Sequence, residues 1–307
     1  MTDRFFDNLM PDLSQSVAEE GDSLMNLLAM PYSFLSQNLQ RSALGLKETV
    51  VMETWGFTGQ LVQDFPLYSG TLGAAFLLFR AYQVTANPND LSLFLQILKA
   101  CLIRLSSYIA NELLYGIVGY LWACLFVNKY VGAETLSSTT IHQVTEEIIK
   151  ESRSMTKNEK SPLMFEWYGQ RYWGTAHGLA GIMHVLMDVQ LKPDEAEDVK
   201  GTLKYLINNR FLGREFLEAG EAAAEVVWNR GLLKRVGICH GISGNAYVFL
   251  SFYRATGRNE YLHRAKAFAS FLLDRGHKLL SKGEMHGGDS PYSLFEGVRW
   301  KDGLSLP

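Results

Sequence analysis

One Gly-x-x-Gly pair of this chain, Gly56/Gly59, fits a loop, whereas the other four constrain its fold more than any other feature. Each of these four pairs opens an apolar stretch of helical length, such as 74–79 after the first pair and 120–127 after the second. Amphipathic segments lie between these stretches, and in 260–276 the apolar residues recur at helical spacing along one side. The pairs are Gly70/Gly73, Gly116/Gly119, Gly178/Gly181 and Gly241/Gly244. The alternation predicts helical hairpins, each with an inner helix buried on every side and an outer helix that faces solvent.

A row of such hairpins leaves an apolar face exposed at each end, and closing the row into a ring removes both ends. Strand signals are sparse, because no extended alternation of apolar and polar residues stands out. We therefore expect an all-α fold, an α/α toroid of Gly-x-x-Gly hairpins. The expected domain covers 1–307 as a single unit, with 1–65 as an N-terminal helical extension within it and 299–307 as a divergent tail.

Glycine suits the start of an inner helix because it tolerates a tight entry and lets a neighbouring backbone or a ligand approach closely. The free N–H groups of the first turn then face the open end of the ring. Helix N-termini that converge on one mouth favour anions, including thiolates and carboxylates. We therefore expect the functional site at this mouth.

The composition excludes several classes of protein. Apolar residues make up 47% and charged residues 20% of the chain, as in globular proteins, and a net charge of -3 leaves no basic stripe for nucleic acid. The three scattered cysteines are too few for a disulfide framework, so we expect a reducing, cytoplasmic location. The N-terminus lacks the basic start and apolar core of a signal peptide. The most apolar uncharged run, 113–127, is shorter than the roughly 20 residues that span a bilayer, so no transmembrane helix is expected.

The clearest chemical feature is the dipeptide Cys239-His240, which directly precedes the pair that begins at Gly241. A thiol and an imidazole are both good ligands for zinc. Zinc usually takes three protein ligands even in a catalytic site, and the dipeptide supplies two. From the spacing alone, a metal site, a reactive thiol at a helix N-terminus and a structurally packed dipeptide all remain open.

Longer motifs give the chain a family resemblance. They are 172–182, Tyr-Trp-Gly-Thr-Ala-His-Gly-Leu-Ala-Gly-Ile; 239–241, Cys-His-Gly; 290–297, Ser-Pro-Tyr-Ser-Leu-Phe-Glu-Gly; and 161–168, Ser-Pro-Leu-Met-Phe-Glu-Trp-Tyr. Together they resemble the motifs of the LanC-like (lanthionine synthetase C-like) proteins of the eukaryotic branch, and the resemblance extends over nearly the whole chain.

The resemblance implies a double-layered α/α barrel that holds zinc at its mouth through two cysteines and a histidine. Bacterial relatives add a cysteine thiol across dehydroalanine or dehydrobutyrine. Eukaryotic relatives bind glutathione and are associated with adding it to such residues in proteins. The implied partners are therefore glutathione or a thiol peptide, and a protein that carries dehydroamino acids.

The same resemblance implies roles for individual residues. Cys239 and His240 match two of the zinc ligands. His177 matches the acid–base histidine, and Glu112 sits where bacterial members carry an acidic residue before a Gly-x-x-Gly pair. In that chemistry zinc makes the thiol a thiolate, and a general acid protonates the enolate that forms after the attack.

The chain also departs from the family pattern, as though whole repeats were missing. The first zinc cysteine of the family lies in a Trp-Cys-His-Gly motif, which is absent here, because 208–211 runs directly into 212–216. A second repeat is missing near 107–110, and 296–298 passes into 299–301 where a Gly-containing final helix is expected. We therefore expect a shortened form with an incomplete ring and an impaired zinc site. Neither Cys124, deep in an inner helix, nor Cys101, on an outer one, is expected to replace the missing ligand.

Other readings stay open beside thiol addition. One is a non-catalytic glutathione-binding or signalling module associated peripherally with the plasma membrane. Another is a carbohydrate enzyme, which needs paired carboxylates such as Glu112 and Glu166. In the plainest readings, His177 packs at a helix start and Glu112 is a first-turn acid favoured by the helix dipole. The aromatic residues then belong to the core: Phe165, Trp167, Tyr168, Tyr172 and Trp173.

Overall fold

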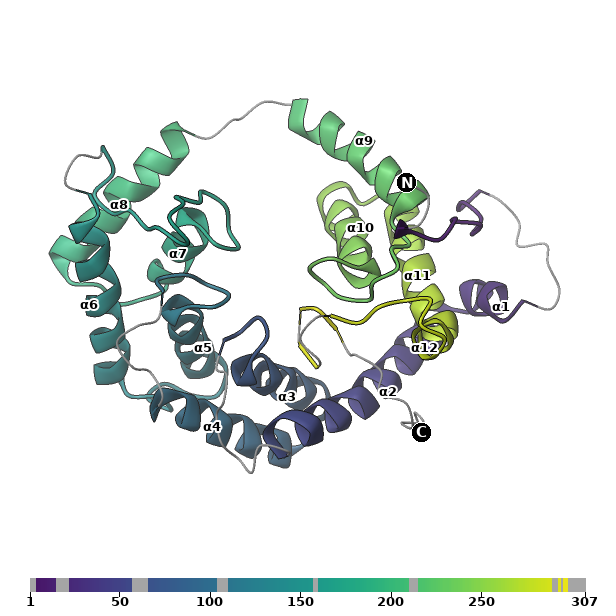
Figure 1. Ribbon diagram of the computed structural model, residues 1–307, viewed down its shortest axis with the longest axis horizontal. Coiled ribbons are helices and arrows are strands. Elements are labelled where there is room, and N and C mark those ends of the chain that lie inside the picture. Colours follow the sequence, from purple (N-terminus) through teal and green to yellow (C-terminus); the bar gives the residue numbers. More distant parts are fainter. Residues whose placement is uncertain are drawn as a thin grey trace. The chain divides into compact units, whose positions relative to one another are not determined.

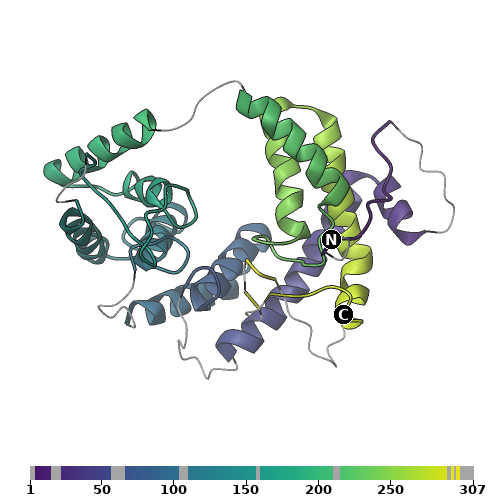
Figure 2. The same ribbon diagram turned by 45° about the horizontal axis from the view of Figure 1, so that its top comes forward.

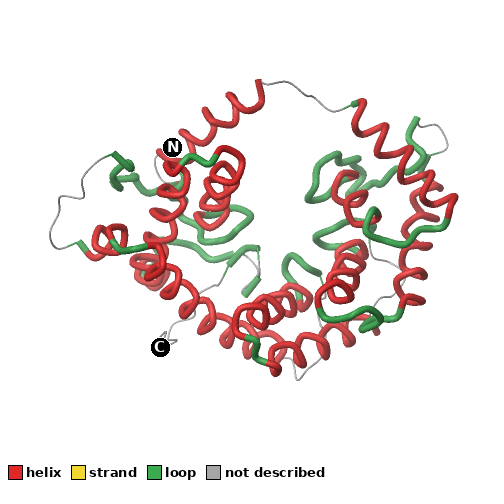
Figure 3. Tube along the Cα trace, turned by 180° about the vertical axis from the view of Figure 1, so that it is seen from behind, coloured by secondary structure: helices red, strands yellow, loops and turns green. Residues whose placement is uncertain are grey.

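The structure is a computed structural model that describes residues 4–14, 22–56, 66–103, 110–156, 160–209, 215–288, 292–293 and 295–297. Helices dominate these ranges, where β-type pairing is limited to isolated bridges such as Phe5 with Leu233 (Figure 3). The prediction of an all-α fold built on Gly-x-x-Gly hairpins is confirmed. No helix within these ranges is both long and apolar enough to cross a membrane. The predicted tail 299–307 lies outside the described residues, as does most of 107–110.

The helices group into two compact units. The first contains 1–60, 77–91 and 213–307, and the second contains 61–76 and 92–212. Helices α3 (Thr71–Thr85) and α4 (Pro88–Ile103) contribute to both units. The organisation of 1–307 as a single domain remains a prediction.

A helical hairpin forms the core of the first unit. Helix α10 (Ile242–Thr256) packs along α11 (Asn259–Phe271), as Figures 1 and 2 show. The rings of Phe249 and Phe268 meet edge to face between them at 5.3 Å, and both side chains are fully buried. The other helices of this unit are α1 (Ser23–Ala29), α2 (Tyr32–Val51), α9 (Glu215–Arg230) and α12 (His277–Ser281), with π-helical turns η2 (Met52–Gly56) after α2 and η3 (Leu272–Gly276) after α11.

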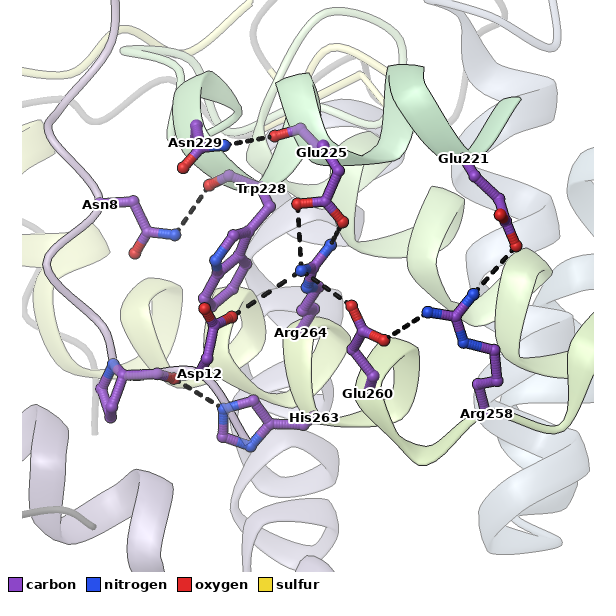
Figure 4. A network of polar contacts seen from close by, with 11 residues as sticks. Asn8, Asp12, Glu221, Glu225, Trp228, Asn229, Arg258, Glu260, His263 and Arg264 are labelled. Atoms are coloured by element: carbon purple, nitrogen blue, oxygen red, sulfur yellow. Dashed lines mark hydrogen bonds and ion pairs between the residues drawn. The ribbon is translucent and has the colours of Figure 1, made fainter. Parts of the chain in front are cut away.

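The N-terminal segment 4–14 is tied to α9, to α11 and to the chain just after α9. The amide of Asn8 donates to the carbonyl of Trp228 at 2.7 Å, and His263 Nε2 donates to the carbonyl of Pro11 at 2.8 Å (Figure 4). The backbone N–H of Phe6 donates to the carbonyl of Leu232 at 2.8 Å. These bonds join the start of the chain to residues more than 200 positions away.

Arg264 organises the charges beside this segment. Its side chain is only 5% exposed, lies over the ring of Trp228 and reaches three carboxylates (Figure 4). The partners are Glu225 at 2.6 Å, Glu260 at 2.9 Å and Asp12 at 3.8 Å. One buried guanidinium therefore links α9, α11 and the N-terminal segment.

Two hairpins form most of the second unit. Helix α5 (Ile117–Tyr130) packs on α6 (Ser138–Ser154), α7 (Leu179–Leu186) packs on α8 (Pro193–Asn208), and α5 also contacts α7. Helix α5 is buried on most sides, whereas α6 buries one face. The buried residues of α6 are Ile141, Val144, Thr145, Ile148, Ile149 and Ser152. The predicted contrast between inner and outer helices is thus present in this unit.

Helices α5, α7 and α10 begin with the same loop. The backbone N–H of the first helical residue donates to the carbonyl seven positions earlier. The bonds are Ile117 to Ala110 (3.0 Å), Leu179 to Tyr172 (2.9 Å) and Ile242 to Arg235 (2.9 Å). Because these bonds satisfy a donor that a helix start leaves unpaired, the loop closes back on its own helix.

In these three loops the second glycine of the pair is required. It lies against the carbonyl six positions earlier, so closely that a Cβ would overlap the oxygen. The contacts are Gly119 with Leu113, Gly181 with Thr175 and Gly244 with Ile238. None of these glycines has a positive φ, so close approach, rather than an unusual backbone angle, explains the Gly-x-x-Gly pattern.

Candidate acid–base site and cysteine–histidine loop

Glu112 lies in the loop before α5, four residues ahead of Gly116. Its side chain is fully buried, and its carboxylate accepts hydrogen bonds from the backbone N–H groups of Leu114 (Oε1, 2.9 Å) and Tyr115 (Oε2, 2.5 Å). Buried backbone N–H groups need such partners. Glu112 therefore stabilises the conformation of the loop before α5.

His177 reaches the same carboxylate from the loop before α7. Its Nδ1 donates to Glu112 Oε1 at 2.7 Å, and 30% of its side chain is exposed. A carboxylate that already accepts from two N–H groups offers lone pairs, so the proton of this bond belongs to Nδ1. Nε2 is then left for a substrate, as an acceptor on the neutral ring and as a donor on the protonated one. This arrangement suits general acid–base catalysis.

Aromatic rings surround the imidazole. Trp167 stacks on His177 with ring centroids 4.3 Å apart, and Tyr172 approaches edge-on at 6.1 Å. The interpretation of the nearby aromatic residues as core holds for Phe165, which is 4% exposed. It is wrong for the exposed side chains of Tyr168, Tyr172 and Trp173. Spacing alone gave no signal that Trp167 touches His177.

The two glutamates named for a carbohydrate enzyme have different surroundings. Glu166 is exposed, whereas Glu112 is fully buried and hydrogen-bonded to two backbone N–H groups and an imidazole. A glycosidase pair needs both carboxyl groups facing the sugar. The surroundings of Glu112 therefore do not favour the carbohydrate reading.

Cys239 and His240 occupy the equivalent loop of the first unit, before α10. The backbone N–H of Cys239 donates to the carbonyl of Phe295 at 3.0 Å. Gly237 lies against the carbonyls of Phe295 and Glu296, where a Cβ would not fit. Phe295 and Glu296 of the C-terminal motif thus fix the backbone at Gly237 and Cys239. Both side chains of the dipeptide are exposed, with Cys239 Sγ 3.8 Å from His240 Nε2.

The donors of this dipeptide fit one edge of a tetrahedral zinc site. Zn–S and Zn–N bonds of about 2.3 and 2.0 Å place two donor atoms roughly 3.5 Å apart, close to the 3.8 Å between Sγ and Nε2. In the part of the chain that the structure describes, however, no group of three His, Cys, Asp or Glu residues could hold a metal ion. The dipeptide alone therefore does not complete a zinc site.

The remaining cysteines are buried in the second unit. Cys101 on α4 is 0% exposed and Cys124 on α5 is 1% exposed. Burial raises the pKa of each thiol to about 12. Among the described residues, neither cysteine belongs to a group of side chains that could hold a metal ion.

The position just before the first glycine carries an aromatic or imidazole side chain in all three loops. Tyr115, His177 and His240 each occupy it, and the three loops share the same backbone hydrogen bonds. The contact between α5 and α7 places two of these positions, Tyr115 and His177, 6.2 Å apart between ring centroids. Register relative to the glycines could have identified Tyr115, which sequence reasoning overlooked.

Gly-started inner helices, a buried glutamate paired with a histidine, and a Cys-His loop at a third glycine pair together define a class of protein. The chain belongs to the lanthionine synthetase C-like protein family, whose model matches residues 62–111, 103–214 and 211–299. One relative, LanC-like protein GCL1 of Arabidopsis thaliana, is 30% identical over 383 residues, covering 91% of this chain and 88% of GCL1. Another, Glutathione S-transferase LANCL1 of Danio rerio, is 30% identical over 278 residues, covering 75% of this chain and 67% of LANCL1.

The matches also bear on the missing repeats. The three matched stretches meet at 103–111 and at 211–214, where the sequence pattern predicts that repeats are lost. The alignment with GCL1 runs over 383 residues and the chain has 307, so GCL1 contains internal sequence that this chain lacks. That this chain is a shortened form remains a prediction.

Proposed function

We propose that this protein handles glutathione or a similar thiol, and that its addition of the thiol to dehydroamino acids in a protein is impaired because its zinc-ligand set is short. The observation that carries the proposal is the hydrogen bond between His177 Nδ1 and Glu112 Oε1 at 2.7 Å, which leaves Nε2 for a substrate. The printed name of the Danio rerio relative, a glutathione S-transferase, supports a thiol partner.

In the proposed reaction the thiolate sulfur forms a bond to the β-carbon of a dehydroalanine or dehydrobutyrine residue. The electron pair of the carbon–carbon double bond moves toward the neighbouring carbonyl to give an enolate. His177, protonated on both nitrogens, donates the Nε2 proton to the α-carbon, and Glu112 stabilises the imidazolium through Nδ1. The product is a thioether, and the proton lost by the thiol replaces the one that His177 gave up.

The proposed reaction needs the thiol as a thiolate. Zinc would favour its thiolate form near neutral pH, with Cys239 and His240 as ligands. Two donors are fewer than the three that such a site takes from the protein. We therefore expect the protein to bind the thiol but to catalyse its addition only slowly. The same shortfall favours a second candidate, a non-catalytic glutathione-binding or signalling module at the cytoplasmic periphery of the plasma membrane.

The test combines metal analysis, binding and turnover on the purified protein. We expect well below one zinc per chain by mass spectrometry, measurable glutathione binding by calorimetry, and slow addition of glutathione to a dehydroalanine peptide. His177→Gln should abolish the addition and leave glutathione binding in place. His184→Gln, which changes an exposed histidine on α7, is the matched control and should behave as wild type.

Three outcomes separate the readings. If wild type binds one zinc per chain and Cys239→Ala binds none, the proposal that the zinc site is impaired is contradicted. Glutathione binding without any addition would favour the non-catalytic module. Absence of glutathione binding would overturn both candidates.

A further inference from the structure

The indole of Trp167 covers one face of the His177 imidazole, with 4.3 Å between centroids and 12° between planes. Tyr115 is also nearly parallel to the indole, at 5.8 Å and 16°, and lies 6.2 Å from the imidazole. Rings on opposite faces of an indole would lie about 7 Å or more apart, because each stacked layer adds about 3.5 Å. His177 and Tyr115 therefore lie side by side on the same face of Trp167.

A tight hairpin sets the position of the indole. Trp167 and Gln170 exchange two backbone hydrogen bonds, of 2.9 and 3.0 Å. Between them Tyr168 and Gly169 have φ values of +49° and +70°, both in the left-handed region, as in a type I′ turn. The ring of Tyr168 also packs on the indole at 4.8 Å. The turn, rather than a helix, thus fixes the position of Trp167 against His177.

Glu112 and Trp167 restrain the imidazole in different ways. Glu112 holds one edge of the ring through Nδ1 at 2.7 Å, and also holds the backbone N–H of Tyr115. A single hydrogen bond leaves the ring free to turn about its Cβ–Cγ bond, which carries Nδ1 away from Glu112. A stacked ring restricts this rotation because turning forfeits the contact between the two faces.

We infer that Trp167 is a positioning residue of the acid–base site. By lying flat on the imidazole it keeps Nδ1 on Glu112 and leaves Nε2 directed to the substrate. The inference deepens the proposed function, on which it rests for the role of His177 as the acid.

The test reads the tautomer of His177 from imidazole ¹⁵N chemical shifts near pH 8.5, where a free imidazole is neutral. Loss of a signal in His177→Gln assigns it. Wild type should hold the proton on Nδ1. In Trp167→Leu the tautomer ratio should shift about two- to tenfold toward Nε2–H. Trp167→Phe, which keeps an aromatic face, should retain the wild-type tautomer.

Trp173→Leu is the matched control. Trp173 is also partly exposed, but it stacks on Tyr205 at 5.5 Å instead of on His177, so its removal should leave the tautomer unchanged. An unchanged tautomer in Trp167→Leu, or an equal shift in Trp173→Leu, would overturn the inference. If Trp167→Leu does not fold, Gly169→Val decides, because a Cβ at Gly169 meets no neighbour within 4 Å and strains only the turn. A shift in that variant supports the inference, and no shift overturns it.

Glutathione addition, measured on the same proteins, separates this inference from the proposed function. If wild type does not add glutathione but its tautomer depends on Trp167, the proposed addition reaction is overturned and the positioning role is retained. An active wild type whose tautomer ignores Trp167 overturns the positioning role alone.

Discussion

Glu112 Oε1 and His177 Nδ1 lie 2.7 Å apart, although 65 positions separate the two residues in the sequence. Each belongs to the loop before an inner helix, and the packing of α5 on α7 brings the two loops together. The buried carboxylate thereby accepts hydrogen bonds from two backbone N–H groups and an imidazole. It is a structural group as well as a candidate functional one.

Glu112→Ala should lower the free energy of unfolding by about 2–4 kcal/mol, because it leaves buried donors without a partner. Urea denaturation followed by circular dichroism measures the loss. Glu166→Gln, at an exposed carboxylate, is the control and should change stability little. A loss below about 1 kcal/mol in Glu112→Ala would show that these hydrogen bonds do not stabilise the fold.

Gly181→Ala should destabilise the protein by about 2–4 kcal/mol or prevent folding, because the new Cβ overlaps the carbonyl of Thr175. Gly174→Ala, in the same loop, adds a Cβ that meets no neighbour within 4 Å and should change stability by less than about 0.5 kcal/mol. Thermal denaturation compares the two variants. Equal losses would argue against close packing as the reason for the Gly-x-x-Gly pattern.

Because two thiols are buried, we expect the free energy of unfolding to fall at alkaline pH. Burial raises the pKa of Cys101 and Cys124 from 9.0 to about 12. Above pH 9 the unfolded chain releases these protons while the folded chain retains them, so the free energy of unfolding falls as pH rises. The contribution is fully present below pH 9 and is lost between pH 9 and about 12.

The measurement compares urea denaturation at several alkaline pH values in three proteins. Between pH 8 and pH 10 each buried thiol should account for a loss of about 1 kcal/mol, which Cys101→Ala/Cys124→Ala should not show. Cys239→Ala removes the exposed thiol and should follow wild type. If the double variant loses stability as steeply as wild type, the thiols are not responsible.

Arg264→Ala should release the N-terminal segment 4–14, because the guanidinium links Asp12 to α9 and α11 and lies over Trp228 (Figure 4). We expect a stability loss of about 1–3 kcal/mol and faster proteolysis within this segment. Limited proteolysis with mass spectrometry locates the cuts. Arg258→Ala is the control, since Arg258 pairs with Glu221 and Glu260 at a half-exposed site. Equal cleavage in both variants would contradict the link.

The helices could be predicted from the sequence because their signals are local. The apolar stretch after Gly116 became a helix buried on most sides, and 260–276 became α11 with its π-helical end. The candidate site was predicted only in part. Glu112, His177, Cys239 and His240 were identified by motif, but their contacts depend on how separate hairpins pack. Trp167 lies in one of the motifs, but its stacking on His177 could not be predicted from residue spacing.

The sequence by itself determined the Gly-x-x-Gly loops, because a carbonyl that closes on its own helix start excludes any side chain from the second glycine. It also determined the family, through motifs that extend along the chain. Only the tertiary structure decided that Glu112 and His177 share a hydrogen bond, that Trp167 covers the imidazole, and that Cys101 and Cys124 stay protonated. Such relationships join segments far apart in the chain, and their strength depends on the burial that packing creates.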